Sequence, residues 1–101
     1  MSNSPPTPVR IKQLSEDRTL TFEFAKKMLP GDAIAGTPVV VIEPDGDITH
    51  SLPQFDGATR VNVRFGGGVE GKNYRISVQV VTQQNEKLEL DVDLQVRDGW
   101  N

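Results

Sequence analysis

The sequence predicts an all-β protein, an immunoglobulin-like antiparallel β-sandwich of about seven strands. The main observation is an alternation of apolar and polar residues near the end of the chain, because a period of two sends every second side chain to the same face of a strand. Two further observations agree with it: turn signals separate several short strand-like segments, and no segment has a convincing helical repeat. The alternating apolar residues form two runs: Tyr74, Ile76, Val78 and Val80, then Leu88, Leu90, Val92, Leu94 and Val96.

The two runs predict a β-hairpin with its turn at residues 83–85. The apolar side chains of the two runs lie on the same face only if the residue numbers of two paired positions add up to an even number, as for Val80 and Leu88. This register also places Arg75 beside Asp93 on the outer face. Such an exposed ion pair contributes only about 0.2 to 1 kcal/mol, so it supports the register more than the stability.

The chain before the hairpin begins with residues 1–8, MSNSPPTP, which contain three prolines and no apolar pattern and are expected to form a flexible arm. A short strand is expected from Val9 to Leu14, with Val9 and Ile11 on one face. The next expected strand, Arg18 to Ala25, is half-buried. Its inward residues are Leu20, Phe22 and Phe24.

The middle of the chain contains the least regular pattern. Residues 26–36 are interpreted as a structured loop, because Pro30-Gly31 interrupts any helical turn. The run of four β-branched residues within Thr37–Glu43 favours a strand that is buried on both faces or covered by a loop on its outer side. The strand is stopped by Pro44-Asp45-Gly46-Asp47, a typical turn sequence.

A short strand is then expected at Ile48–Leu52, and a clearly alternating one at Thr59–Phe65, followed by a glycine-rich turn at Gly66–Gly71. The sandwich is therefore expected to span residues 9–97, with residues 98–101 as a C-terminal tail. The inward residues of the alternating strand are Val61, Val63 and Phe65.

Length and composition limit the classes of function. A chain of 101 residues fits one domain, and the absence of cysteine suits a reducing cytosol. No apolar run is long enough for a membrane span, and no signal peptide is evident at the N-terminus. The net charge of -3 and the scattered bases argue against a nucleic-acid partner. Arg60, Arg64 and Arg75 are expected to be solvated or paired with acids on adjacent strands.

Two loops contain patterns that resemble ligand sites. Gly66, Gly68 and Gly71 match Gly-x-Gly-x-x-Gly, but a dinucleotide site needs a helix after the glycines, and the residues that follow alternate as a strand. The acids of Glu43–Asp47 have the spacing of calcium ligands without the rest of an EF-hand loop, so an ordinary turn is the preferred interpretation and calcium binding stays open.

No set of residues predicts catalysis or a cofactor. His50 is the only histidine, and without cysteine it has no partner for a zinc site or a thiol nucleophile. A serine triad through Ser51 or Ser77 lacks a nucleophile-elbow motif. The acids Glu89, Asp91 and Asp93 line one solvent face of a strand, where they discourage aggregation. We therefore predict a non-enzymatic protein with no catalytic, cofactor-binding or metal-binding residues.

Four residues are the candidates for contacts with a partner. Trp100 either folds back over one end of the sandwich or projects toward a partner, as tryptophans at interfaces do. Phe55 is the other aromatic residue that periodicity does not place in the core. Pro5 and Pro6 lie in the N-terminal arm, which is expected to gain contacts in an assembly.

Two stretches of the chain resemble a family of small bacteriophage virion proteins, the fibre-tail adaptor or neck-associated proteins. The first is Thr21–Ile34 (TFEFAKKMLPGDAI), an early strand followed by a loop of the Ala-Lys/Arg-x-Leu-x-Gly-Asp type, which here has one residue more between the alanine and the leucine. The second is the glycine-rich turn and hairpin of Gly67–Val96. Its matching residues are Gly71, Tyr74, Ile76, Val80 and Thr82.

This resemblance implies an immunoglobulin-like structural protein of the virion. It would be synthesised in the host cytoplasm and would link tail or connector proteins to fibres through protein–protein contacts, in several copies and with other virion proteins as partners. The alternative is a small carbohydrate- or ligand-binding β-sandwich module. A sugar site would normally show exposed aromatic residues in the loops, and only Phe55 and Trp100 are available for that role.

Overall fold

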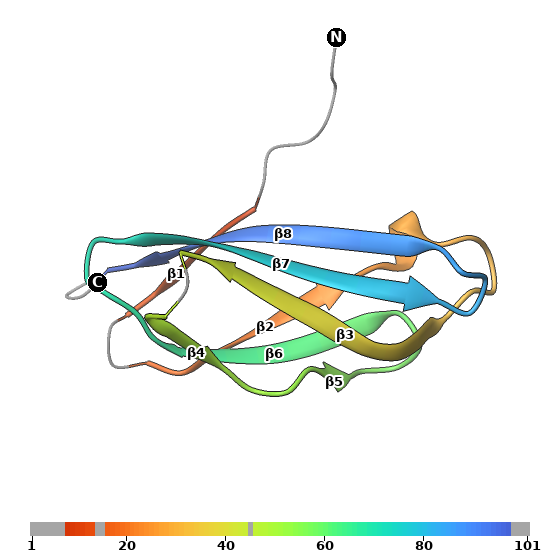
Figure 1. Ribbon diagram of the computed structural model, residues 1–101, viewed down its shortest axis with the longest axis horizontal. Helices are drawn as coiled ribbons and strands as arrows, with labels where there is room; N and C mark the ends of the chain where they lie inside the picture. The colour runs from red at the N-terminus through yellow and green to blue at the C-terminus, as the bar shows by residue number, and fades with distance from the viewer. Residues whose placement is uncertain (1–7, 14–15, 45, 98–101) are drawn as a thin grey trace, which may run out of the picture.

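The computed structural model describes residues 8–13, 16–44 and 46–97, and these residues form two β-sheets packed face to face (Figure 1). One short 3₁₀ helix, η1, spans Ala25–Lys27. The strands are β1 (Val9–Lys12), β2 (Arg18–Glu23), β3 (Ile34–Glu43), β4 (Ile48–His50), β5 (Gln54–Phe55), β6 (Arg60–Gly67), β7 (Asn73–Thr82) and β8 (Lys87–Val96).

The strand order confirms the predicted all-β sandwich. Sheet A has the order β1-β8-β7-β3, and sheet B has the order β2-β6-β4, with the two-residue strand β5 also paired to β6. Neighbouring strands are antiparallel except for β1 and β8, which are parallel. The sequence pattern did not predict the parallel pair or β5. No helix in the described part of the chain is long and apolar enough to cross a membrane.

The core lies between the two sheets and consists of the residues that the alternation predicts. Phe22 of β2 and Phe65 of β6 meet edge to face, with ring centroids 6.5 Å apart. Such aromatic pairs stabilise a core beyond the area that they bury. The buried apolar residues are Leu20, Phe22, Phe24, Ile48, Val61, Val63, Phe65, Tyr74, Ile76, Val78, Val80, Val92, Leu94 and Val96.

The register of the β7–β8 hairpin is confirmed. Val80 lies opposite Leu88, and Arg75 lies opposite Asp93, with 3.6 Å between Arg75 Nε and Asp93 Oδ1. Both ion-pair side chains are well exposed to solvent, so their contribution to stability is small.

The prediction for the valine run of β3 is wrong. β3 is an edge strand of sheet A, and its outer face is open: Val39 is 54% exposed and Val41 is 40% exposed. The strand also begins three residues earlier than expected, at Ile34, and contains a register shift between Ala35 and Val39. Irregularities of this kind are common on edge strands, where they limit unwanted pairing with other chains.

The short strand β1 has an unexpected orientation. Val9 and Ile11 do share a face, but they lie beside Asp93 and Gln95 on the outer side of sheet A, whereas Lys12 is fully buried. The Lys12 ammonium donates hydrogen bonds to the carbonyl oxygens of Gln13 (2.7 Å) and Gly67 (2.8 Å). Burial lowers the pKa of Lys12, and the nearby acids Asp17 and Glu16 oppose this shift.

The predicted structured loop of residues 26–36 contains the end of η1 and the start of β3, and it is fixed to the β7–β8 turn. Asp32 is buried, and its Oδ1 accepts hydrogen bonds from the backbone N–H groups of Ala33 and Gln84. Burial opposes ionisation of Asp32, but hydrogen bonds from Thr82 and from backbone N–H groups outweigh it and lower the pKa. The loop and the turn are therefore joined at one end of the sandwich.

Candidate interaction surface

An apolar patch lies on the outer face of sheet A. It consists of Val39 and Val41 on β3 and Val81 on β7, and we call these three residues the valine patch. Val81 is 42% exposed, comparable with the two β3 residues. The patch is exposed because nothing in the described chain packs over these three residues on the outer face of sheet A. Contiguous exposed apolar side chains on a small domain are typical of binding surfaces.

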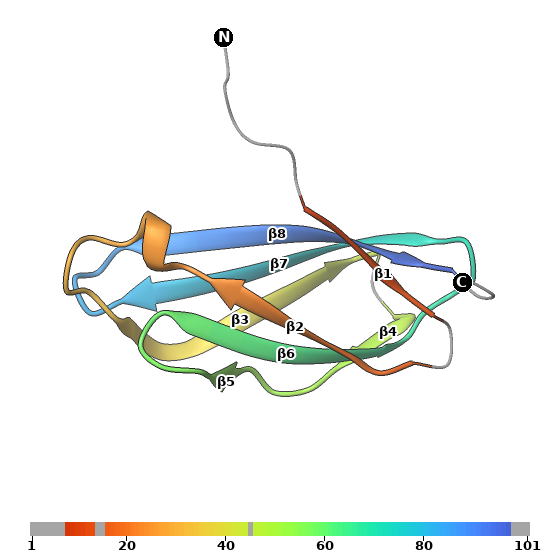
Figure 2. The same cartoon turned by 180° about the vertical axis from the view of Figure 1, so that it is seen from behind.

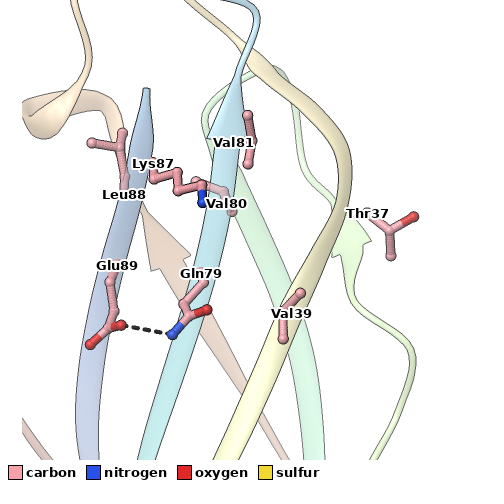
Figure 3. Close-up of a pocket in the computed structure, with 8 residues that line it drawn as sticks. All are labelled: Thr37, Val39, Gln79, Val80, Val81, Lys87, Leu88 and Glu89. Atoms are coloured by element: carbon pink, nitrogen blue, oxygen red, sulfur yellow. Dashed lines mark hydrogen bonds between the residues drawn. The ribbon is translucent and has the colours of Figure 1, made fainter. Parts of the chain in front are cut away.

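The valine patch borders a groove of about 460 Å³ that crosses three strands (Figure 3). In the groove Gln79 donates a hydrogen bond to Glu89, 2.9 Å from Nε2 to Oε1. The groove thus combines the apolar side chains of Val39 and Val81 with polar side chains from all three strands. Its lining residues are Thr37, Val39, Gln79, Val80, Val81, Lys87, Leu88 and Glu89.

A second exposed apolar pair lies beside sheet B. Phe55, one of the predicted contact residues, is 53% exposed on β5, and Leu52 is 80% exposed just before it. The other three predicted contact residues, Trp100, Pro5 and Pro6, lie outside the described residues.

A polar groove of about 270 Å³ lies on the outer face of sheet B, lined by Thr19, Ser51, Gln54, Asn62 and Arg64. Arg64 is the only charged residue among them. None of the lining residues is aromatic, although a sugar site would normally offer an aromatic ring for stacking. The groove therefore gives little support to the carbohydrate-binding alternative.

The glycine-rich segment is a connection between two strands, as predicted, with β6 ending at Gly67 and β7 beginning at Asn73. Gly68 has a φ of +100°, and a Cβ on it would lie 2.7 Å from Val96 Cγ2 and 2.9 Å from Ile48 Cδ1. Glycine is required at this position by both the backbone conformation and the close packing. No phosphate-binding helix follows the segment.

Asp47, one of the loop acids at the same end of the sandwich, is bonded to two residues at the start of β7 and just before it. Asp47 Oδ2 lies 2.7 Å from Lys72 Nζ and 3.3 Å from the hydroxyl of Tyr74. The Tyr74 hydroxyl in turn accepts a hydrogen bond from the N–H of Val69 at 2.8 Å. Asp45 lies outside the described residues, and no group of three potential metal ligands occurs among those that are described.

These contacts predict how stability depends on acidity. The hydrogen bond from Lys72 lowers the pKa of Asp47 below its ordinary value of about 3.9. A carboxylate with a lowered pKa in the folded state adds stability above the unfolded pKa, and this is lost as the pH falls through the folded pKa. We expect the free energy of unfolding, measured with urea between pH 7 and pH 2, to fall below about pH 4.

Asp47→Asn is expected to reduce this fall, and Lys72→Met is expected to reduce it similarly because it removes the main cause of the pKa shift. Both variants keep the size of the side chain close to the original. An unchanged acid dependence in both would show that the Asp47–Lys72 pair does not contribute to it.

The remaining candidate residues do not assemble a reactive site in the described chain. His50 is exposed, and its Nδ1 lies 2.9 Å from the carbonyl oxygen of Ser51. The Ser51 hydroxyl accepts a hydrogen bond from the N–H of Arg64 and donates one to the carbonyl of Leu52. Ser77 lies on β7 of sheet A, whereas His50 lies on β4 of sheet B.

The three outward arginines do not form one basic face. Arg60 and Arg64 belong to sheet B, and Arg75 belongs to sheet A. Arg60 Nε lies 2.7 Å from Glu23 Oε1 on the adjacent strand β2, and this hydrogen bond raises the pKa of Arg60. The pKa of Glu23 is lowered mainly by a backbone hydrogen bond from Ala25, and also by hydrogen bonds from Thr59 and Arg60. Pairing with acids on adjacent strands is therefore observed for Arg60 and Arg75.

The fold and the surface together define a small two-sheet β-sandwich protein that exposes an apolar strand face. A family model described as "Podophage GP4 fiber-tail adaptor protein gp77" matches residues 12–95. The chain belongs to this family of phage fibre-tail adaptors, which confirms the resemblance seen in the sequence. A search of curated proteins found no match.

Proposed function

We propose that the protein is a non-enzymatic adaptor at the neck or tail of the virion, where it links tail or connector proteins to fibres through protein–protein contacts. The family match over residues 12–95 carries this proposal. The valine patch supports it, because an adaptor needs exposed surface that a partner covers. Binding of metal ions, cofactors or small molecules is not part of the role.

We also infer an immunoglobulin-like arrangement of the strands. Without β5, the orders β2-β6-β4 and β1-β8-β7-β3 correspond to a seven-stranded immunoglobulin sandwich whose first strand pairs with the last. Tyr74 supports the inference, because it lies at the start of the next-to-last strand and its hydroxyl bonds the backbone of Val69. A tyrosine corner in immunoglobulin-like domains has this geometry.

The adaptor is expected to make its contacts from more than one surface. The valine patch belongs to sheet A, whereas Leu52 and Phe55 lie beside sheet B. Trp100, Pro5 and Pro6 stay candidates for further contacts. Several copies synthesised in the host cytoplasm would be incorporated around the tail, so that like copies can also be neighbours.

The test uses particles of the encoding phage that are assembled without this chain. We expect them to lack attached fibres, and we expect the purified chain to bind to them and to restore fibre attachment, measured by co-sedimentation of the fibre protein with the particles. A chelator of divalent cations is the control and should have no effect. Fibre attachment in the absence of the chain, or a chain that does not bind the particles, would contradict the proposed role.

A further inference from the structure

The edge of sheet A that is formed by β8 is only half covered. β1 pairs with Asp93–Val96, so the first half of β8, Lys87–Val92, has a neighbour on the β7 side alone. Within residues 8–13, 16–44 and 46–97, no other strand pairs with it. Figure 2 shows β1 crossing only one end of β8.

The direction of the backbone groups on this half-strand follows from the hydrogen bonds around it. The N–H of Asp93 donates to Pro8 and the N–H of Arg97 donates to Lys12, whereas the N–H of Val96 donates to Lys72 beside β7. Backbone groups alternate along a strand, so odd-numbered residues face the β1 edge. Lys87, Glu89 and Asp91 therefore direct their N–H and C=O groups toward the uncovered edge.

The residues that precede β1 are not suited to complete this ladder. In the observed parallel register Val9 lies opposite Asp93, so a chain continuing backwards would need the N–H of residue 8 to bond the carbonyl of Asp91. It would need the N–H of residue 6 to bond the carbonyl of Glu89. Both positions are proline, which has no N–H group.

The opposite edge of sheet A is a poorer template for pairing. By the same alternation, Val40 and Ile42 direct their backbone groups to the free edge of β3. The next positions that face this edge on either side are Pro38 and Pro44, which cannot donate. Prolines of this kind protect edge strands from pairing, whereas the exposed half of β8 contains no proline.

Charge indicates what kind of strand would fit the β8 edge. The side chains of Glu89, Asp91 and Asp93 project from the outer face beside it, with Lys87 on the same strand and Arg75 of β7 lying 3.6 Å from Asp93. The Oδ1 atom of Asp91 is buried and has no hydrogen-bond partner. A neighbouring strand with lysine or arginine on alternate residues would place positive charges next to this acidic row, at cross-strand distances of about 5 Å.

We propose that the β8 edge from Lys87 to Asp91 binds an extended strand of another virion protein, with basic side chains on alternate residues. The strand adds to sheet A by backbone hydrogen bonds, and the acidic row selects its sequence. This proposal rests on the adaptor role, because it assumes that the chain binds a protein partner in the particle.

The proposal is tested with particles assembled without this chain, to which the purified full chain is added. In the unbound chain, deuterium exchange of the amides of Glu89 and Asp91 should be fast, and that of Leu88 and Leu90, which face β7, should be slow. On the particle the amides of Glu89 and Asp91 should become protected. A bound chain in which they stay fast would overturn the proposal.

Two variants test independently whether the β8 edge binds the partner. Glu89→Pro removes an N–H that faces the open edge, a place where proline is tolerated, and Glu89→Arg reverses one charge of the acidic row. Each should weaken binding to the particles about tenfold or more, as the loss of about 1.4 kcal/mol would. Glu70→Arg, the same charge change in the exposed connection between β6 and β7, should bind within about twofold of the original chain.

The β8 proposal and the adaptor role are tested separately by these measurements. If the original chain binds the particles but neither Glu89 variant weakens binding relative to Glu70→Arg, the β8 proposal is wrong and the adaptor role stands. If the original chain does not bind at all, both are wrong. Circular dichroism of each variant shows whether it is folded, and the exchange measurement on the unmodified chain decides the matter if Glu89→Pro does not fold.

Discussion

Phe65→Ala is expected to destabilise the protein by about 3 to 5 kcal/mol, the usual range for removing a buried phenylalanine. Phe65 has no exposed surface, lies on β6 in the centre of sheet B, and packs edge to face against Phe22. Alanine would leave a cavity that the strands on both sides of β6 hold open. Because a domain of this size is stable by only about 5 to 15 kcal/mol, the variant would be close to unfolding at 37 °C.

Urea denaturation followed by circular dichroism measures this loss, and the melting temperature should fall on the order of 20 °C. Phe55→Ala is the matched control, because the same change is made on a neighbouring strand of the same sheet at a side chain that is 53% exposed. It should change the free energy of unfolding by less than about 0.5 kcal/mol. Equal effects of the two variants would mean that the packing between the sheets is not as described.

The alternation in the sequence was sufficient to predict the strands that have neighbours on both sides. In β6 and β7 the inward residues, such as Val63 and Ile76, are buried as expected, because a strand in the middle of a sheet has one face on the core and one in solvent. The hairpin register could also be predicted, since only an even sum of paired positions keeps the apolar faces of β7 and β8 together.

The two outer strands of sheet A, β1 and β3, could not be predicted in the same way. The burial of Val39 and Val41 depends on whether another part of the chain packs over the outer face of sheet A, and nothing in the described chain covers these two residues. The orientation of β1 likewise depends on its parallel pairing with β8, which turns Lys12 inward. Local periodicity contains no information on such long-range partners.

The candidate surface was missed for this reason. Phe55 falls outside any alternating run, which makes it a candidate contact residue, and it is 53% exposed. The run that contains Val39 and Val41 predicts a strand buried on both faces or covered by a loop, because four consecutive β-branched residues usually indicate a buried strand. A useful signal was present in Pro38, since proline within a strand sequence favours an edge position.

Val41→Lys is expected to prevent the chain from binding to particles assembled without it. Lysine at position 41 would place a hydrated charge in the apolar patch that we propose the partner covers, where an unpaired charge has a high desolvation cost. We expect a loss of binding of about a hundredfold or more, as for a residue that contributes strongly to an interface. Folding should be little affected, because the side chain already projects into solvent.

Val69→Lys is the control for this experiment. Val69 is 46% exposed, similar to Val41, but it lies in the connection between β6 and β7 and outside the valine patch. This variant should bind like the original chain and restore fibre attachment to the same extent. If both variants bind normally, the outer face of β3 is not a contact surface, and the β8 edge and the Leu52–Phe55 pair become the regions through which the adaptor acts. If both fail to bind although circular dichroism shows them folded, the added positive charge is responsible rather than its position, and binding must depend on the charge of the whole chain.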